Sequence, residues 1–197
     1  MPASRRPRKS FIGRNALAIG LALVFATSAG NGLSARTITL DSALSQLIGQ
    51  APHLAGETLG ADTLGGKPVV LSFFASWCPP CNAEFKHLAK VFQRFRPRGL
   101  AVVAINLHED FGGFSDGGKR LGRFLARHDP AFSVVKGDQE ISRRLGGIDR
   151  IPTVFVFDPT GAAVLHFTHA RGAAKTNPSF EELEAAVMRA IGTKQKN

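Results

Sequence analysis

The stretch Trp77-Cys78-Pro79-Pro80-Cys81 decides the fold, and it contains both cysteines of this 197-residue chain. Immediately before it, Val69–Phe74 is a continuous apolar run, rich in β-forming residues, of the kind that makes a buried strand. After it, apolar residues recur at helical spacing with basic residues between them, which predicts an amphipathic helix to about Phe95. Two thiols three positions apart at the start of a helix can close into a disulfide and reopen. The position of the pair therefore indicates a redox motif.

Strands and helices alternate along the rest of the chain, and a strand hairpin with a final helix closes it. This order predicts an α/β sheet of mixed direction. The run 100–106 follows the helix after the cysteines, so the first two core strands should be parallel. Further strands are expected at 132–136, 153–158 and 163–168, and further helices near 44–48 and at 119–128, 139–145 and 179–191. Ser179 and Glu182 form the capping box that opens the last helix.

The charge of the chain is strongly positive but unevenly placed. The formal net charge is +10, and five of the 25 Lys and Arg residues precede residue 31. The other basic residues are scattered over helix faces and are not interleaved with base-stacking aromatics, which argues against a nucleic-acid-binding protein.

Residues 1–35 resemble an export signal, and residues 36–197 are expected to form one folded domain. A basic start is followed by the apolar, uncharged segment 16–26 and then by small residues at 27–30, the order of a secretory signal. The apolar segment is short for a membrane span of about 20 residues. We therefore expect either a cleaved signal peptide or an N-terminal anchor, and a periplasmic or other extracytoplasmic location. Thiols tend to be oxidised there, so the cysteines form either a stable disulfide or a maintained redox centre.

The order of elements resembles the thioredoxin fold, with the cysteine motif after the first core strand and Ile151-Pro152-Thr153 before the hairpin. More narrowly, the chain is similar to the exported TlpA/ResA/CcmG group of thiol–disulfide oxidoreductases. The resemblance covers about residues 50–192, and its sharpest points are residues 74–81, Glu84 and residues 147–153. It implies a central mixed β-sheet flanked by helices.

The spacing of the cysteines also predicts their roles. Cys78 should lie at the helix N-terminus, where the helix dipole and free N–H groups favour a thiolate, so we expect it to be the exposed, attacking sulfur. Cys81, one turn inside, would resolve the mixed disulfide. Pro79 and Pro80 cannot donate an N–H to the thiolate, which should leave Cys78 less acidic and favour a reductant. The alternative is a static structural disulfide.

The resemblance implies a proton-handling role for Glu84, three residues after the second cysteine. Ordinary thioredoxins carry a buried Asp six residues before the first cysteine, and that place is Ser72 here. A carboxylate near the resolving thiol can accept its proton, especially if burial raises the carboxyl pKa. The alternative is a solvated glutamate in the first helical turn.

The residues expected to contact the substrate are Trp77, Pro79, Pro80, Ile151 and Pro152. The resemblance implies that Pro152 is cis and faces the disulfide and that Ile151 exposes its backbone to an incoming peptide; the alternative is a trans proline that starts a strand. Trp77 should pack over the motif and modulate access. Two features depart from the family: no proline follows Glu84 closely, and the segments 111–118 and 169–178 look long.

No resident cofactor or metal is predicted. Asn82 follows the motif where a haem-attachment site needs histidine, and there is no second cysteine pair for zinc. Two groups of residues could be imagined as metal ligands, namely His108 with Glu109 and Asp110, and His166 with His169. We interpret these histidines as surface or loop residues.

The sequence thus predicts an exported protein-disulfide reductase. By resemblance, its substrates are proteins with disulfides, such as apocytochrome c or oxidised metallochaperones, and its electrons come from a membrane thiol donor. Three alternatives remain open on the same fold: a disulfide-forming oxidant, a copper(I)-handling chaperone that uses both cysteines and a histidine, and a peptide-binding module with an inert disulfide.

Overall fold

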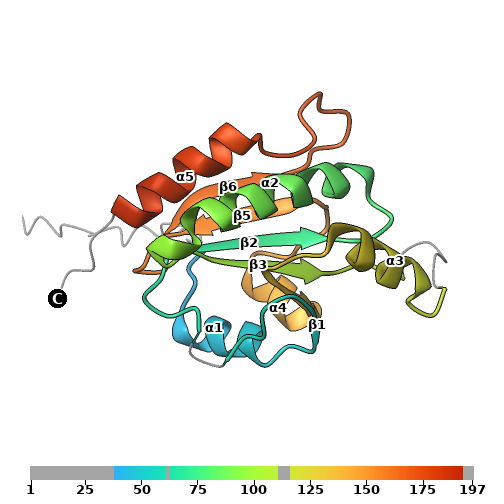
Figure 1. Ribbon diagram of the computed structural model, residues 1–197, viewed down its shortest axis with the longest axis horizontal. Coiled ribbons are helices and arrows are strands. Elements are labelled where there is room, and N and C mark those ends of the chain that lie inside the picture. The colour runs from blue at the N-terminus through green and yellow to red at the C-terminus, as the bar shows by residue number, and fades with distance from the viewer. Residues whose placement is uncertain (1–37, 61–62, 111–115, 193–197) are drawn as a thin grey trace, which may run out of the picture. The chain divides into compact units, whose positions relative to one another are not determined.

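The computed structural model describes residues 38–60, 63–110 and 116–192 (Figure 1). The elements, in chain order, are α1 (Ser42–Gly49), β1 (His53–Ala55), β2 (Val69–Phe74), α2 (Pro79–Phe95), the 3₁₀ helix η1 (Arg96–Arg98), β3 (Ala101–Asn106), α3 (Lys119–His128), β4 (Ser133–Lys136), α4 (Gln139–Arg144), β5 (Thr153–Phe157), β6 (Ala163–Thr168) and α5 (Phe180–Gly192). None of the helices in these described parts combines the length and the apolar character that crossing a membrane requires. The signal or anchor expected at residues 1–35 lies outside the described residues.

The strands form one mixed sheet in the order β1-β4-β3-β2-β5-β6. β2 is parallel to β3 and antiparallel to β5, as the predicted β-α-β unit and hairpin require. In this register Phe74 pairs with Asn106, and Phe73 pairs with Thr153. The loops that follow β2 and β3 and the loop that precedes β5 therefore meet at one end of the sheet, beyond the carboxyl ends of β2 and β3.

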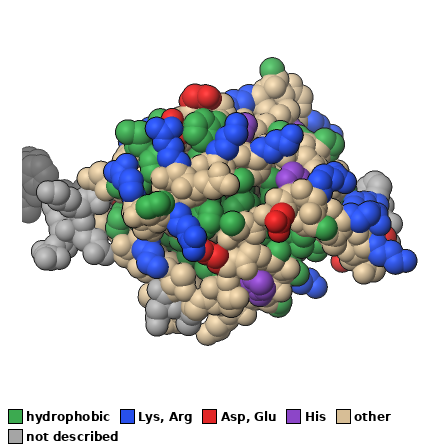
Figure 2. Space-filling view, viewed as in Figure 1, with side chains coloured by type: hydrophobic (Ala, Val, Ile, Leu, Met, Phe, Trp, Pro, Cys, Tyr) green, Lys and Arg blue, Asp and Glu red, His purple; other side chains and the backbone are tan. Residues whose placement is uncertain are grey.

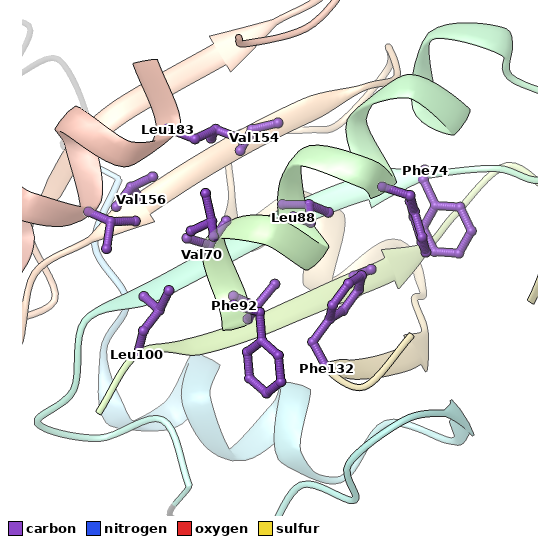
Figure 3. Close-up of a cluster of buried hydrophobic side chains, with 14 of the residues drawn as sticks. Val70, Phe74, Leu88, Phe92, Leu100, Phe132, Val154, Val156 and Leu183 are labelled. Carbon is purple, nitrogen blue, oxygen red and sulfur yellow. The ribbon is translucent and has the colours of Figure 1, made fainter. Parts of the chain in front are cut away.

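The sheet is covered on both faces. α2 and α5 lie on one face, and α1 and α4 lie on the other (Figure 1). Side chains of β2 alternate between the two cores: Val70 and Phe74 pack with α2, whereas Leu71 and Phe73 pack on the α1 side. Figure 3 shows the first core, with Val70, Leu88 and Val154 in its centre. Burial on both faces explains why the strand is a continuous apolar run in the sequence.

The bounds predicted for the core strands and for α3, α4 and α5 agree with the structure to within one residue, and α2 ends at Phe95 as predicted. The capping box of α5 is present: the Ser179 N–H donates to Glu182 Oε2 at 2.8 Å, and the Glu182 N–H donates to Ser179 Oγ at 3.3 Å. β1 was not predicted. It is a three-residue edge strand with an exposed or half-buried pattern, so it carries no apolar periodicity.

Leu88 is expected to make a large contribution to stability, because its side chain is fully buried between α2 and the sheet. Leu88→Ala should lower the free energy of unfolding by about 2–5 kcal/mol, since it removes apolar contacts and leaves a cavity. Urea denaturation of the disulfide form measures this loss. Met188→Ala on α5 is the control, because Met188 is 53% exposed and should cost less than about 0.5 kcal/mol. Equal losses for the two variants would contradict the packing of α2 described above.

Candidate active site

The cysteine motif lies where β2 turns into α2. Cys78 is the N-cap residue of α2, and its N–H donates to the Ala75 carbonyl at 3.1 Å, which closes a tight turn between strand and helix. Pro79 and Pro80 occupy the first helical positions. Proline fits there because the N–H groups of the first turn have no partner within the helix. The predicted position of Cys78 at a helix N-terminus is confirmed.

Cys78 and Cys81 form a disulfide with their Cα atoms 5.3 Å apart. Cys81 is fully buried, and Cys78 retains only 3% of its surface. The prediction of an exposed Cys78 is therefore wrong for the disulfide form. The physical reason is that both cysteines pack into the core on the α2 side of the sheet, with Phe74 and Phe85 in the same cluster. The residual exposure nevertheless belongs to the first cysteine.

Glu84 lies on α2, three residues after Cys81 and on the same side of the helix. It is fully buried, which excludes the alternative of a solvated glutamate. Ser72 Oγ donates a hydrogen bond of 2.8 Å to Glu84 Oε1, while Oε2 has no hydrogen-bond partner among the described residues. Desolvation raises the pKa of Glu84 to about 8, and the hydrogen bond from Ser72 opposes part of that rise. The carboxyl group of the disulfide form is therefore mostly protonated at neutral pH.

The peptide bond between Ile151 and Pro152 is cis, as the resemblance implied. Pro152 directly precedes β5, whose first residue pairs with Phe73 near the end of β2. Ile151 is half-buried and packs against the cluster that contains both cysteines. The loop before β5 thus lies beside the redox motif, and the two segments that the sequence analysis assigned to the site are brought together.

Trp77 is held in place rather than free over the motif. Its side chain is half-buried against the core, and its indole Nε1–H donates to the His108 carbonyl at 2.9 Å. The partner comes from the loop after β3, which the sequence analysis left outside the site.

A carboxylate in that same loop holds the backbone before the cysteines. Glu109 Oε2 accepts a hydrogen bond from the Ser76 N–H at 3.0 Å and another from Asn106 Nδ2 at 2.8 Å, and Ser76 Oγ also donates to this carboxylate. The sequence analysis missed Ser76, Asn106 and Glu109 as site residues. The sequence did carry an indication of their role, because Asn106 and Glu109 come at the carboxyl end of a buried parallel strand, which is the end of the sheet where such sites form.

The first turn of α2 is bonded to α3. Asn82 Nδ2 donates to the Cys78 carbonyl at 3.2 Å, and Asn82 Oδ1 lies 3.1 Å from His128 Nε2. The pKa of His128 is lowered, first by burial and then by the positive charges of Arg127 and Lys86. Figure 2 shows Lys and Arg side chains gathered over α3, at the right of the view. A basic helix therefore borders the redox motif.

The two histidines of β6 and its following loop do not form a metal site with other described residues. Among residues 38–60, 63–110 and 116–192, no group of three or more His, Cys, Asp or Glu side chains is placed to hold a metal ion. The His166 ring stacks on Phe155 at a centroid distance of 4.2 Å, and burial lowers its pKa. The His169 N–H donates to the Pro152 carbonyl at 3.0 Å, just beyond the end of β6.

Comparison with known proteins agrees with this geometry. A model of the AhpC/TSA family matches residues 48–165, which is more than half of the chain. The thiol–disulfide oxidoreductase ResA of Halalkalibacterium halodurans is 30% identical over 113 residues, which cover 56% of this chain and 59% of that protein. The thiol:disulfide interchange protein DsbE of Pasteurella multocida is 29% identical over 106 residues, which cover 53% of this chain and 51% of that protein. The chain thus spans little more than half the length of these relatives.

A solved structure supports the fold. A secreted disulfide oxidoreductase of Mycobacterium tuberculosis, described as homologous to DsbE of E. coli, matches with a TM-score of 0.59 at 23% identity, over 76% of this chain and 99% of that one. The predicted thioredoxin-like fold, with a mixed sheet flanked by helices, is confirmed. The predicted resemblance to ResA-type proteins is confirmed by the curated relatives.

Proposed function

The chain belongs to the AhpC/TSA family, and on that basis we propose that it is a thiol–disulfide oxidoreductase that reduces disulfides in other proteins. One observation carries this proposal: a cysteine pair at the N-terminus of α2 lies on the same helix as a buried carboxyl group one turn further on. A purely structural disulfide gives no reason to bury an unpaired carboxyl oxygen beside it, because such burial costs stability.

The reaction begins with the reduced dithiol. The Cys78 thiolate attacks one sulfur of the substrate disulfide, forms a mixed disulfide and releases the other substrate sulfur as a thiolate that takes up a proton. Cys81 then loses its proton and attacks the Cys78 sulfur, which frees the second substrate thiol. Two electrons have passed to the substrate, and the protein is left with the Cys78–Cys81 disulfide. A dithiol donor returns it to the reduced state.

Glu84 is proposed to hold the proton that Cys81 exchanges. The carboxyl group is protonated in the disulfide form at neutral pH, since its pKa is about 8. When the disulfide is opened by the electron donor, this proton can pass to the Cys81 sulfur. When Cys81 attacks in the forward reaction, the carboxylate takes a proton back. The group therefore works in both halves of the cycle.

The substrate-binding surface is proposed to comprise Trp77, Pro79 and Pro80 on one side and the loop with Ile151 and Pro152 on the other. Pro79 is exposed and Pro80 half-buried, so the start of α2 is open to a partner. A substrate chain lying along Ile151 would bring its disulfide to Cys78, the cysteine that retains some exposure.

The cellular setting is also proposed. We propose that the protein is exported and acts in the periplasm or another extracytoplasmic compartment, either released by signal cleavage or anchored by its N-terminal segment. The signal-like composition of residues 1–35 supports this location. The proposed substrates are disulfide-containing proteins such as apocytochrome c or oxidised metallochaperones, and the proposed electron source is a membrane thiol protein. Loss of electron supply would leave the protein in the disulfide form seen here.

The reduction potential of the Cys78–Cys81 pair tests the direction of electron flow. A value near or below about −200 mV is expected, because the two prolines at the start of α2 deprive the Cys78 thiolate of N–H donors. The reduced form is then less stabilised, which lowers the potential. Equilibration of the full chain with glutathione or dithiothreitol measures it. A potential near about −120 mV would instead identify a disulfide-forming oxidant and contradict a reductase.

A further inference from the structure

His108 connects two loops that flank the disulfide. Its backbone carbonyl accepts the indole N–H of Trp77 at 2.9 Å, and its side-chain Nε2 lies 2.8 Å from the Ile148 carbonyl. Trp77 belongs to the loop before the cysteines, and Ile148 belongs to the loop that leads to Pro152. One residue from the loop after β3 thus bonds to both sides of the proposed substrate-binding surface.

The backbone of His108 is in the left-handed region, with φ of 61°. A residue with a Cβ atom adopts this conformation at a cost, and such positions persist where surrounding contacts hold them. The next residue supplies that hold, because the Glu109 carboxylate is bonded to Ser76 and Asn106. The turn is therefore anchored to β3 and to the redox loop independently of the imidazole.

The chemistry of the second bond assigns the proton on the ring. The Ile148 carbonyl can only accept, so Nε2 must carry the hydrogen and act as the donor. An Nε2 used in this way has no free lone pair for a metal ion. His108 lies in the loop after β3, in agreement with its interpretation as a surface or loop histidine, and it is half-buried and bonded through both its carbonyl and its ring.

We propose that His108 is a positioning residue that ties the Trp77 side of the redox motif to the loop carrying Ile151 and Pro152, and so fixes the surface on which a protein substrate docks. This inference rests on the proposed function. Its imidazole does not touch the reacting sulfurs. It should therefore affect the binding of a polypeptide that contacts both loops, and not the reaction of Cys78 with a small disulfide.

Four variants separate the side chain from the backbone. His108→Gly removes the imidazole but keeps both the left-handed conformation and the carbonyl that Trp77 uses. His108→Ala removes the imidazole and, like histidine, keeps a Cβ atom. His108→Gln places an amide N–H near the position of Nε2. His53→Gly is the matched control, because His53 Nε2 also lies near a carbonyl, that of Gly56 at 3.1 Å, but on β1 at the sheet edge.

The readouts are insulin reduction driven by dithiothreitol, reduction of the small disulfide 5,5′-dithiobis(2-nitrobenzoate), and fluorescence of Trp77, the only tryptophan of the chain. In His108→Gly we expect KM for insulin to rise about tenfold, as one lost hydrogen bond with its acceptor left unpaired would produce. The kcat for insulin, the rate with the small disulfide and the Trp77 emission should stay close to those of the unmodified protein. His108→Gln should restore KM, His108→Ala should raise KM as His108→Gly does, and His53→Gly should leave all three readouts unchanged.

The inference would be overturned by an insulin KM within about twofold of the unmodified protein in His108→Gly, or by a KM that His108→Gln fails to lower while its Trp77 emission is normal. A parallel fall in the rates with both substrates would also contradict it, because that would show general damage to the site. Failure of the unmodified chain to reduce either substrate has a different meaning. That failure would contradict the proposed function itself, and this inference would then have no basis.

Discussion

Cys78→Ser is expected to abolish the reduction of protein disulfides, whereas Cys81→Ser is expected to accumulate a covalent complex with the substrate. The difference follows from the geometry of α2. Cys78 is its N-cap residue, where the helix dipole favours a thiolate, and it retains the small exposure of the pair. Cys81 is fully buried one turn inside, so its only accessible partner is the Cys78 sulfur.

Insulin reduction and non-reducing electrophoresis with a disulfide substrate measure the two outcomes. Cys78→Ser should show only the background rate of dithiothreitol, and Cys81→Ser should show a band of the protein joined to its substrate that disappears on reduction. Circular dichroism of both variants confirms that they are folded. Activity retained in a folded Cys78→Ser variant, or a Cys81→Ser variant that traps nothing, would contradict the proposed roles.

Glu84→Gln is expected to make the disulfide form more stable at alkaline pH. The pKa of Glu84 is raised from 4.5 to about 8 in the folded protein, so between these values the folded state holds a proton that the unfolded state releases. Stability therefore falls as pH rises from about 4.5 to about 8 and levels off above that range. The whole effect amounts to at most about 5 kcal/mol, since one pKa unit corresponds to about 1.4 kcal/mol.

Glutamine keeps an oxygen that can accept from Ser72 but has no charge to desolvate. Urea unfolding of the disulfide form at pH 4.5 and pH 8.5 should show equal stability of the two proteins at the lower pH and a more stable variant at the higher pH. Glu140, whose side chain is 44% exposed, supplies the control variant Glu140→Gln, which should behave like the unmodified protein at both pH values. If Glu84→Gln unfolds in parallel with the unmodified protein at both pH values, the carboxyl group does not carry the proton assigned to it.

The same variant should also slow catalysis. Loss of a positioned proton donor and acceptor typically reduces a rate by about a hundredfold or more. Insulin reduction by Glu84→Gln should fall by that order while the cysteines still form a disulfide. A variant with an unchanged rate across the pH range would show that the buried carboxyl group is not used in proton transfer.

Much of the fold was predictable because it depends on short stretches of sequence. The continuous apolar run of β2, the helical spacing of α2 and the Ser179–Glu182 capping box are local patterns, and their predicted bounds agree with the structure. The thioredoxin-like resemblance added the cis peptide before Pro152. The unpredicted β1 has no comparable pattern, since only a backbone pairing with β4 defines it.

The candidate active site likewise has features that depend on local sequence and features that depend on tertiary contacts. The sequence alone determined the cysteine spacing, the helix start that places Cys78 at its N-terminus and the presence of a glutamate one turn beyond Cys81, because each depends on neighbours within a few residues. Only the tertiary structure decided what these residues contact. Ser72 and Glu84 are 12 residues apart, Ser76 and Glu109 are 33 apart, and His108 and Ile148 are 40 apart. The Ser72–Glu84 bond exists because α2 packs on β2, and the other two exist because β3 and β5 both flank β2 in the sheet. Burial of Glu84 on α2 raises its pKa, and the two longer-range bonds hold the loops beside the disulfide.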